Sequence, residues 1–228
     1  MLSIRHIALA LGTILTLGAG AAQANGAVVD AYGDFLPTFT GPANGDLDVI
    51  AAAGFYDGAA QNFTFSTILA DTVGTTPGAL YVWGIDRGLG TERFVTGTPS
   101  IGAGVSFDSV LLVRLDGTGV FNDFIQGVVT PLDPSMIHLS SVTVSVEALP
   151  LSLFAPNAAG FVAPDQYTWN LWPRVGLGSN SQISDFAPDA SNLAFQVTAV
   201  PEPESWALFL SGLAVTGFVA RQRAREAR

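Results

Sequence analysis

The chain has 228 residues, with nine arginines and no lysine against 19 acidic residues, and it contains no cysteine. The lack of cysteine excludes disulfides, thiolate zinc sites and a cysteine nucleophile. The net charge of −10 argues against nucleic acid as a partner, because phosphate binding requires Lys and Arg. An acidic surface keeps a protein soluble and is compatible with divalent cations.

The N-terminus has the pattern of a signal peptide. Arg5 and His6 precede an apolar run over residues 7–17, and residues 22–24 are Ala-Gln-Ala. A charged start, a short apolar run and an A-x-A site are the features that signal peptidase recognises. The run is too short for a transmembrane helix, which needs about 20 apolar residues. We therefore expect signal peptidase to remove residues 1–24 on export.

Residues 25–199 predict one β-rich domain. Turn signals such as Asp57-Gly58 recur roughly every ten residues, with short β-branched and aromatic segments between them. Residues 62–66 and 141–146 alternate apolar and polar side chains, which is the period of a half-buried strand. Residues 50–53 fit a helical turn or a strand, and the turn that follows favours a strand. The predicted fold is a single antiparallel β-sandwich, of the jelly-roll or immunoglobulin-like type.

An acidic segment near the start of this body predicts a metal site. The body holds four arginines and sixteen acidic residues, a formal charge of −12. Four of the acids lie close together, separated by glycines and prolines: Asp30, Asp34, Asp46 and Asp48. Calcium takes about six to eight oxygen ligands, and Asp34, Asp46 and Asp48 are the best candidates to supply some of them. The EF-hand spacing is missing, and the competing interpretation is that these are turn residues.

Aromatic residues suggest a second candidate site. The segment 30–49 resembles the first strands of DOMON-like and family 9 carbohydrate-binding sandwiches, with Phe39 where such sequences often carry an aromatic; the resemblance implies a sugar-binding sandwich. Tyr81 and Trp83 fall on one face of a strand, and together with Trp169 they would offer sugars a stacking platform. The competing interpretation, which we favour, is that these large rings fill the core.

No motif in the body predicts catalysis. It lacks a G-x-S-x-G elbow, a phosphate loop and a dinucleotide fingerprint, and nothing places Glu92 or Glu147 opposite a second carboxyl. His138 is expected to be structural or at the surface, and Asp86-Arg87 to form a turn with a surface ion pair. We therefore expect a non-catalytic structural or adhesive protein. The alternatives are a calcium-stabilised polysaccharide-binding module and a glycan-active enzyme.

The C-terminus combines an apolar run with a basic cluster. Residues 206–220 are apolar, and an arginine-rich tail over residues 221–228 follows, with Arg221, Arg223, Arg225 and Arg228. As a helix the run spans roughly 23 Å, which is short of the ~30 Å hydrocarbon core. Snorkelling of Arg221 and a thin local bilayer make up some of this difference. Arginine clusters stay in the cytoplasm. The sequence predicts a transmembrane helix that holds the body outside the inner membrane.

A short motif, Pro201-Glu202-Pro203, precedes this run within the segment 200–228. The order of motif, apolar helix and arginine cluster resembles the PEP-CTERM sorting signal of exported proteins in Gram-negative bacteria. The resemblance implies that exosortase recognises the motif and removes the tail. The protein would then reach the cell surface or extracellular matrix, where exopolysaccharide is a candidate partner. Two prolines suit this role because they remove backbone donors and hold the segment extended.

Overall fold

The computed structural model describes residues 26–198. The predicted signal peptide, the sorting motif, the transmembrane helix at 206–220 and the arginine-rich tail lie outside this range. Within it, no helix has the length and apolarity needed to cross a bilayer. The helices in this range are short 3-10 turns: η1 (Gly45–Leu47), η2 (Arg93–Thr96), η3 (Pro134–Met136), η4 (Leu151–Phe154), η5 (Pro164–Gln166) and η6 (Asn180–Gln182).

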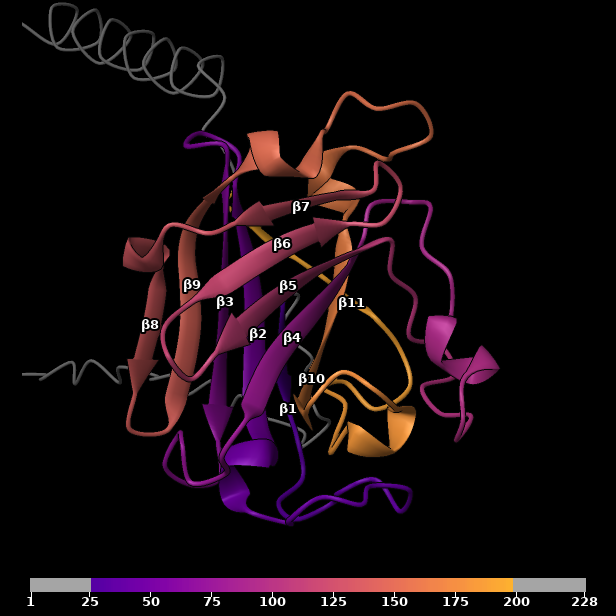
Figure 1. The fold of residues 1–228 in the computed structure, drawn as a ribbon. Coiled ribbons are helices and arrows are strands. Elements are labelled where there is room, and N and C mark those ends of the chain that lie inside the picture. The colour runs from indigo at the N-terminus through magenta and orange to yellow at the C-terminus, as the bar shows by residue number, and fades with distance from the viewer. Residues whose placement is uncertain (1–25, 199–228) are drawn as a thin grey trace, which may run out of the picture.

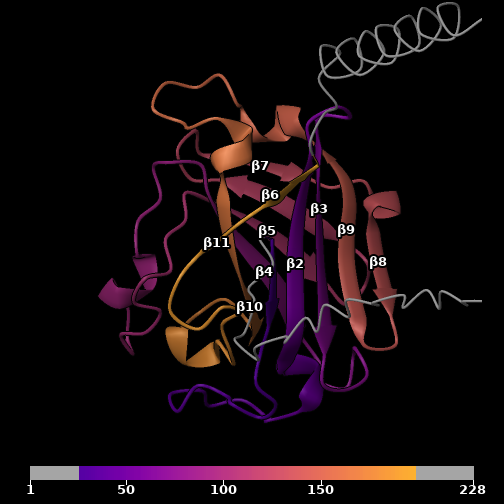
Figure 2. The ribbon, with the colours of Figure 1, turned by 180° about the vertical axis from the view of Figure 1, so that it is seen from behind.

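The body consists of two mainly antiparallel sheets that lie face to face. Figure 1 shows sheet B in front, and Figure 2, seen from behind, shows sheet A in front. Sheet A has the order β1 (Ala27–Val29), β2 (Val49–Asp57), β3 (Asn62–Leu69), β9 (Thr143–Pro150), β8 (Ile137–Ser140), and β12 (Gln196–Thr198) pairs parallel with β2. Sheet B has the order β11 (Leu193–Ala194), β10 (Thr168–Val175), β4 (Ala79–Asp86), β5 (Ser109–Arg114), β6 (Gly119–Asp123), β7 (Val128–Pro131).

These strands confirm the all-β prediction for the described residues. Residues 50–53 belong to β2 and residues 62–66 to β3, and the turn that begins at Gly58 joins the two strands. Most of the alternating stretch 141–146 belongs to β9. The finer assignment to a jelly-roll or an immunoglobulin-like sandwich stays a prediction.

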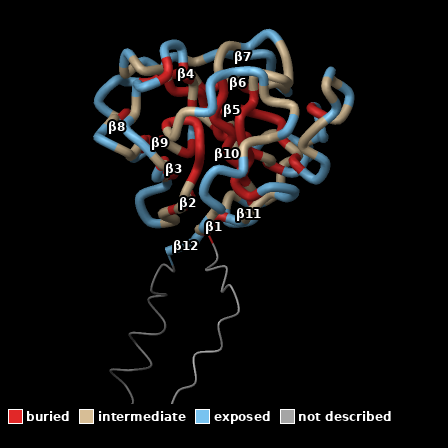
Figure 3. The backbone as a smooth tube through the Cα atoms, turned by 90° about the horizontal axis from the view of Figure 1, so that it is seen from below, coloured by how far each residue is buried: buried red, intermediate tan, exposed pale blue. Residues whose placement is uncertain are grey.

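The main hydrophobic core lies between the sheets, where buried residues gather in Figure 3. From sheet A, Phe63 and Phe65 point into it and are fully buried. From sheet B, Trp83, Leu111 and Trp169 do the same. Because side chains alternate across a strand, the intervening residues of sheet B point to its opposite, outer face.

The outer face of sheet B carries a second hydrophobic cluster. The side chains of Val82, Leu112 and Trp172 point to this side of the strands. They pack against three rings from the connecting segments, Phe94, Phe107 and Phe186. Sheet B is therefore covered on both faces, which accounts for the unbroken apolar run of β5. Gly84 makes room for this cover, since a Cβ there would lie 2.3 Å from the Trp172 ring.

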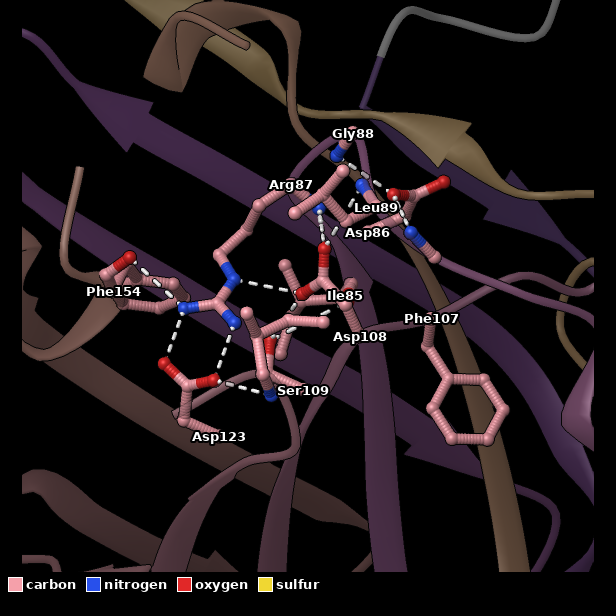
Figure 4. A network of polar contacts seen from close by, with 12 residues as sticks. Ile85, Asp86, Arg87, Gly88, Leu89, Phe107, Asp108, Ser109, Asp123 and Phe154 are labelled. Atoms are coloured by element: carbon pink, nitrogen blue, oxygen red, sulfur yellow. Dashed lines mark hydrogen bonds and ion pairs between the residues drawn. The ribbon is translucent and has the colours of Figure 1, made fainter. Parts of the chain in front are cut away.

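A buried arginine joins the ends of three strands of sheet B (Figure 4). The guanidinium of Arg87 donates through Nε to Asp108 at 2.7 Å and through Nη1 and Nη2 to Asp123 at 2.8 Å each. Nη1 also donates to the carbonyl of Phe154 at 2.9 Å. The guanidinium carbon lies 4.1 Å from the ring centroid of Phe161. The network connects β4, β5, β6 and η4 through a single side chain.

This finding corrects the expectation of a surface ion pair at Asp86-Arg87. Arg87 is 0% exposed, and its partners are not Asp86 but Asp108 and Asp123. Burial would lower the pKa of Arg87, but the hydrogen bonds that its guanidinium donates to Asp123 and Asp108 outweigh burial and raise the pKa overall. Asp86 instead accepts from the backbone N–H groups of Gly88 and Gly90, which forms the predicted turn.

Candidate functional site

Five aspartates gather where the segment after β1 meets the segment after β10. Asp34, Asp48 and Asp185 form one group, and Asp30, Asp185 and Asp189 form another. In each group, one carboxylate oxygen per residue lies within 4.8 Å of the others. Asp34 and Asp48 were predicted together, and the fold adds Asp185 from a distant part of the chain.

The backbone explains why these segments meet. Asp48 lies at the end of η1 and directly before β2. The N–H of Val49 donates to Oδ2 of Asp185 at 3.0 Å, and the N–H of Leu36 donates to the carbonyl of Ser184 at 2.8 Å. The loop after β10 is thus hydrogen-bonded to both sides of the acidic segment.

Two of the five carboxylates are almost fully buried, and oxygens of the group lack partners. Asp48 and Asp185 are each 1% exposed. Oδ2 of Asp48 accepts from the N–H of Gly33 at 2.9 Å, whereas its Oδ1 has no hydrogen-bond partner. Oδ2 of Asp30 is likewise buried without a partner. Buried polar atoms in folded proteins are rarely left unpaired, so these oxygens are free to take a ligand.

The electrostatics of the group favour a cation. Burial, followed by repulsion from Asp30 and Asp34, raises the pKa of Asp185 to about 8. Burial also raises the pKa of Asp30 to about 7, with further repulsion from Asp34, Asp189 and Asp48. None of the five has a basic side chain within ion-pair distance in the described part of the chain. Several converging carboxylates without a counter-charge match the oxygen ligands that calcium prefers.

Asp46, the third predicted ligand, does not join the group. It is fully buried, but its carboxylate accepts from the N–H of Thr76 at 2.7 Å and from Thr76 Oγ1 at 2.6 Å. Its two oxygens are therefore occupied by the loop before β4. Of the three predicted ligands, Asp34 and Asp48 lie in one group with Asp185, and Asp46 lies outside both groups; that a metal binds there stays a prediction.

The predicted stacking platform is wrong. Tyr81, Trp83 and Trp169 are each 0% exposed and belong to the core between the sheets. A ring in that position cannot stack on a sugar unless the sheets separate, so the favoured core interpretation is confirmed. Phe39 is partly buried against the same core, and its ring is stacked on that of Phe35 with a distance of 6.1 Å between the ring centroids.

His138 is at the surface, as expected. Its side chain is 53% exposed and its Nε2 lies 3.9 Å from an oxygen of Glu147. An exposed pair of this kind contributes little to stability.

Comparison with protein-family models matches residues 199–224 to the PEP-CTERM protein-sorting motif. Comparisons with curated proteins and with solved structures find no match. The matched stretch lies outside the described residues and bears on sorting, not on the chemistry of the body. It supports export in a Gram-negative bacterium and recognition by exosortase. The likeness of residues 30–49 to DOMON-like and family 9 carbohydrate-binding sandwiches stays a prediction.

Proposed function

Because this chain carries a PEP-CTERM protein-sorting motif, we propose that it is an exported, non-catalytic structural or adhesive component of the cell envelope or extracellular matrix. The match at residues 199–224 carries the proposal. Signal peptidase removes residues 1–24, and the helix at 206–220 holds the body at the inner membrane. Exosortase then recognises Pro201, Glu202 and Pro203 and releases the body.

The position of the domain's two ends supports this order of events. The first residue of β1, Ala27, pairs with Ala53 of β2, and the first residue of β12, Gln196, pairs with Phe55 of the same strand. A Cβ on Gly26 would lie 2.3 Å from the Cβ of Gln196. Both ends therefore leave at one edge of sheet A, beside each other in Figure 3. Two membrane enzymes could process these ends while the domain keeps one orientation.

The construction of the body supports a structural role. Exported domains are often reinforced by disulfides, and this chain has no cysteine. The Arg87 network connects separate strands by side-chain hydrogen bonds instead. Sheet B is also packed on both faces. Such a body suits a protein that must persist outside the cell.

Processing tests the proposal, with a matched pair of substitutions. Glu202→Gln alters the motif, while Glu204→Gln makes the same change in charge just outside it. In a host with exosortase, we expect mass spectrometry to find a trimmed C-terminus for the wild type and for Glu204→Gln. Glu202→Gln should stay full-length after signal removal and fractionate with the inner membrane. Identical processing of the two variants, or an intact chain in the cytosol, contradicts the proposal.

A calcium-stabilised polysaccharide-binding module is the second candidate, favoured by the group Asp34, Asp48 and Asp185 with its unpaired Asp48 oxygen. Calcium that binds only the folded chain stabilises it by about 2.7 kcal/mol at a hundredfold excess over Kd. For a domain of this size that raises Tm by about 5–11 °C. Calcium should thus raise the melting temperature relative to EDTA, and magnesium should do so less.

Variants locate the cation in this second candidate. Asp185→Asn should abolish the calcium-dependent rise in Tm, because it removes the carboxylate shared by both groups. Asp165→Asn is the matched control, since it neutralises an exposed carboxylate outside both groups. A wild type whose Tm is the same in calcium and in EDTA rules out this function and leaves the sorting proposal untouched.

A further inference from the structure

A cleft opens on the outer face of sheet B, beside the second hydrophobic cluster. Its volume is about 490 Å³, within the range of about 300–1,000 Å³ that small-ligand sites usually have. Val82, Val110 and Leu112 supply apolar surface from the strands. Polar, aromatic and basic side chains surround them, chiefly Arg93, Phe107, Asn122, Phe124, Trp172 and Arg174.

Arg174 is the most unusual group in this cleft. It is only 7% exposed, and its guanidinium donates to two backbone carbonyls, from Nε to Gly176 at 2.5 Å and from Nη2 to Ser179 at 3.0 Å. A guanidinium has five N–H donors, so most of them remain available. No carboxylate lies within ion-pair distance of it among residues 26–198. Burial lowers its pKa, with no acidic neighbour to oppose the shift.

The other buried arginine of the described residues, Arg87, has its charge compensated by two aspartates. Leaving a buried charge uncompensated is costly. Arg174 therefore has the environment of a cation whose counter-ion comes from outside the chain.

A second arginine borders the same cleft. Arg93, on η2, is exposed and donates from Nε to the carbonyl of Phe107 at 3.3 Å. Its guanidinium carbon lies 4.5 Å from the ring centroid of Phe124, a cation–π contact that orients the side chain. It too has no carboxylate partner within the described range.

Register places a third arginine on the same face. Arg174 is paired with Leu80 on β4, and Leu80 is paired with Arg114 on β5. Residues directly opposite in neighbouring strands share a face, so Arg114 lies two strand spacings from Arg174, roughly 10 Å. All the arginines of residues 26–198 without an ion pair thus belong to one side of a body whose formal charge is −12.

We propose that this cleft binds the carboxylate of an acidic sugar unit in an anionic polysaccharide. Arginine forks match the planar geometry of a carboxylate and bind it through two hydrogen bonds. The aliphatic side chains and the partly buried ring of Phe124 suit the apolar face of a sugar ring, and Asn122 supplies an amide for its hydroxyls. The inference goes beyond the proposed function by naming a binding face and a ligand class, and it depends on neither the sorting motif nor the calcium group.

Calorimetric titration of the purified full-length protein tests the site. The probe is an oligogalacturonate, and its fully methyl-esterified form is the control because esterification removes the carboxylate charges and keeps the sugar chain. EDTA is present throughout, so that calcium bridging to the aspartates cannot contribute. We expect the acidic oligomer to bind at least about tenfold more tightly than the ester, because charge-assisted hydrogen bonds are the strong ones. Added salt should weaken this binding.

Substitutions place the ligand in the cleft. Arg93→Gln should weaken oligogalacturonate binding about tenfold, and because Arg93 is exposed the variant should fold. Arg174→Gln should weaken it at least as much; if that variant fails to fold, Arg93→Gln alone decides. Arg114→Gln is the matched control, outside the cleft on the same face, and should change affinity less than about threefold.

Four results overturn the inference. The first is no binding of the acidic oligomer at about 10 mM, and the second is an ester that binds as tightly as the acidic oligomer. The third is an equal loss of affinity in Arg93→Gln and Arg114→Gln, and the fourth is acetate or inorganic phosphate that binds as tightly as the acidic oligomer. The third would mean attraction by overall charge, and the fourth a site for simple anions that does not recognise a sugar. None of them bears on processing by exosortase.

Discussion

Removing Arg87 should destabilise the protein more than removing any other arginine of the described body. In Arg87→Met, Asp108 keeps its bond from the N–H of residue 87, and Asp123 keeps those from Ile125 and Gln126. Both carboxylates, however, lose their counter-charge while they remain buried. Breaking a buried ion pair by removing one partner costs about 3–5 kcal/mol. For a domain of this size that lowers Tm by about 6–20 °C.

Thermal unfolding followed by circular dichroism measures this cost. Arg114→Met is the control, because Arg114 is only partly buried and has no ion pair among residues 26–198; its effect should stay within about 1 kcal/mol. Adding Asp123→Asn to Arg87→Met should restore part of the loss, since it removes one of the uncompensated charges. A drop in Tm no larger than that of Arg114→Met would refute the reasoning.

The same network predicts a pH effect whose sign follows from Asp123. Burial alone would raise the pKa of Asp123, but the hydrogen bond from Arg87 leads the groups that lower it below 3.8 overall. A folded-state pKa below the unfolded value gives stability that is present above pH 4 or so and is lost as pH falls through the folded pKa. This acid-sensitive part of the wild-type stability should be smaller in Arg87→Met, which a pH series of melting curves would detect.

Two further predictions concern the acidic group and the cover of sheet B. In EDTA, Tm should fall as pH rises from about 4 to 8, because the pKa values of Asp30 and Asp185 are raised to about 7 and 8 and the folded state holds more protons than the unfolded state in that window. Calcium should suppress this fall. A Tm in EDTA that does not change with pH would count against the acidic group. Gly84→Ala should lower the free energy of unfolding by about 1–3 kcal/mol, because the added Cβ would clash with Trp172. Gly178→Ala is the control: its Cβ would lie 3.6 Å from the nearest atom, in ordinary van der Waals contact, and the variant should melt within about 2 °C of wild type.

The strands could be predicted from the sequence because their signals are local. The alternation at residues 62–66 and the turn signal at Asp57-Gly58 depend on neighbours only, and both are found as expected. The same alternation placed Tyr81 and Trp83 on one face correctly. It could not settle which face was inside, and sheet B has a hydrophobic cover on each.

The sites were harder to predict because their members come from distant segments. Asp185 joins the acidic group by accepting a hydrogen bond from the N–H of Val49, 136 residues away in the chain. Asp46 is only two residues from Asp48, but its carboxylate accepts a hydrogen bond from Thr76, which belongs to another loop. Arg87 looked like a turn residue because it precedes Gly88, and nothing near it in sequence reveals Asp108 or Asp123. A buried charge is visible in the sequence only when its partner is a neighbour.

The two proposals place the attachment point of the membrane tether, residues 199–228, and the cleft on different layers of the body. The described part of the chain ends in β12 at the edge of sheet A, while Arg93 and Arg174 border a cleft on the outer face of sheet B. Sheet A does not cover that face. If the proposed membrane anchoring is right, the unprocessed body should therefore bind acidic oligosaccharide as well as the released body does. Titration of unprocessed Glu202→Gln and of the trimmed protein should give dissociation constants within about threefold, and a site that appears only after release would mean that the tether, or the membrane beside it, covers the cleft.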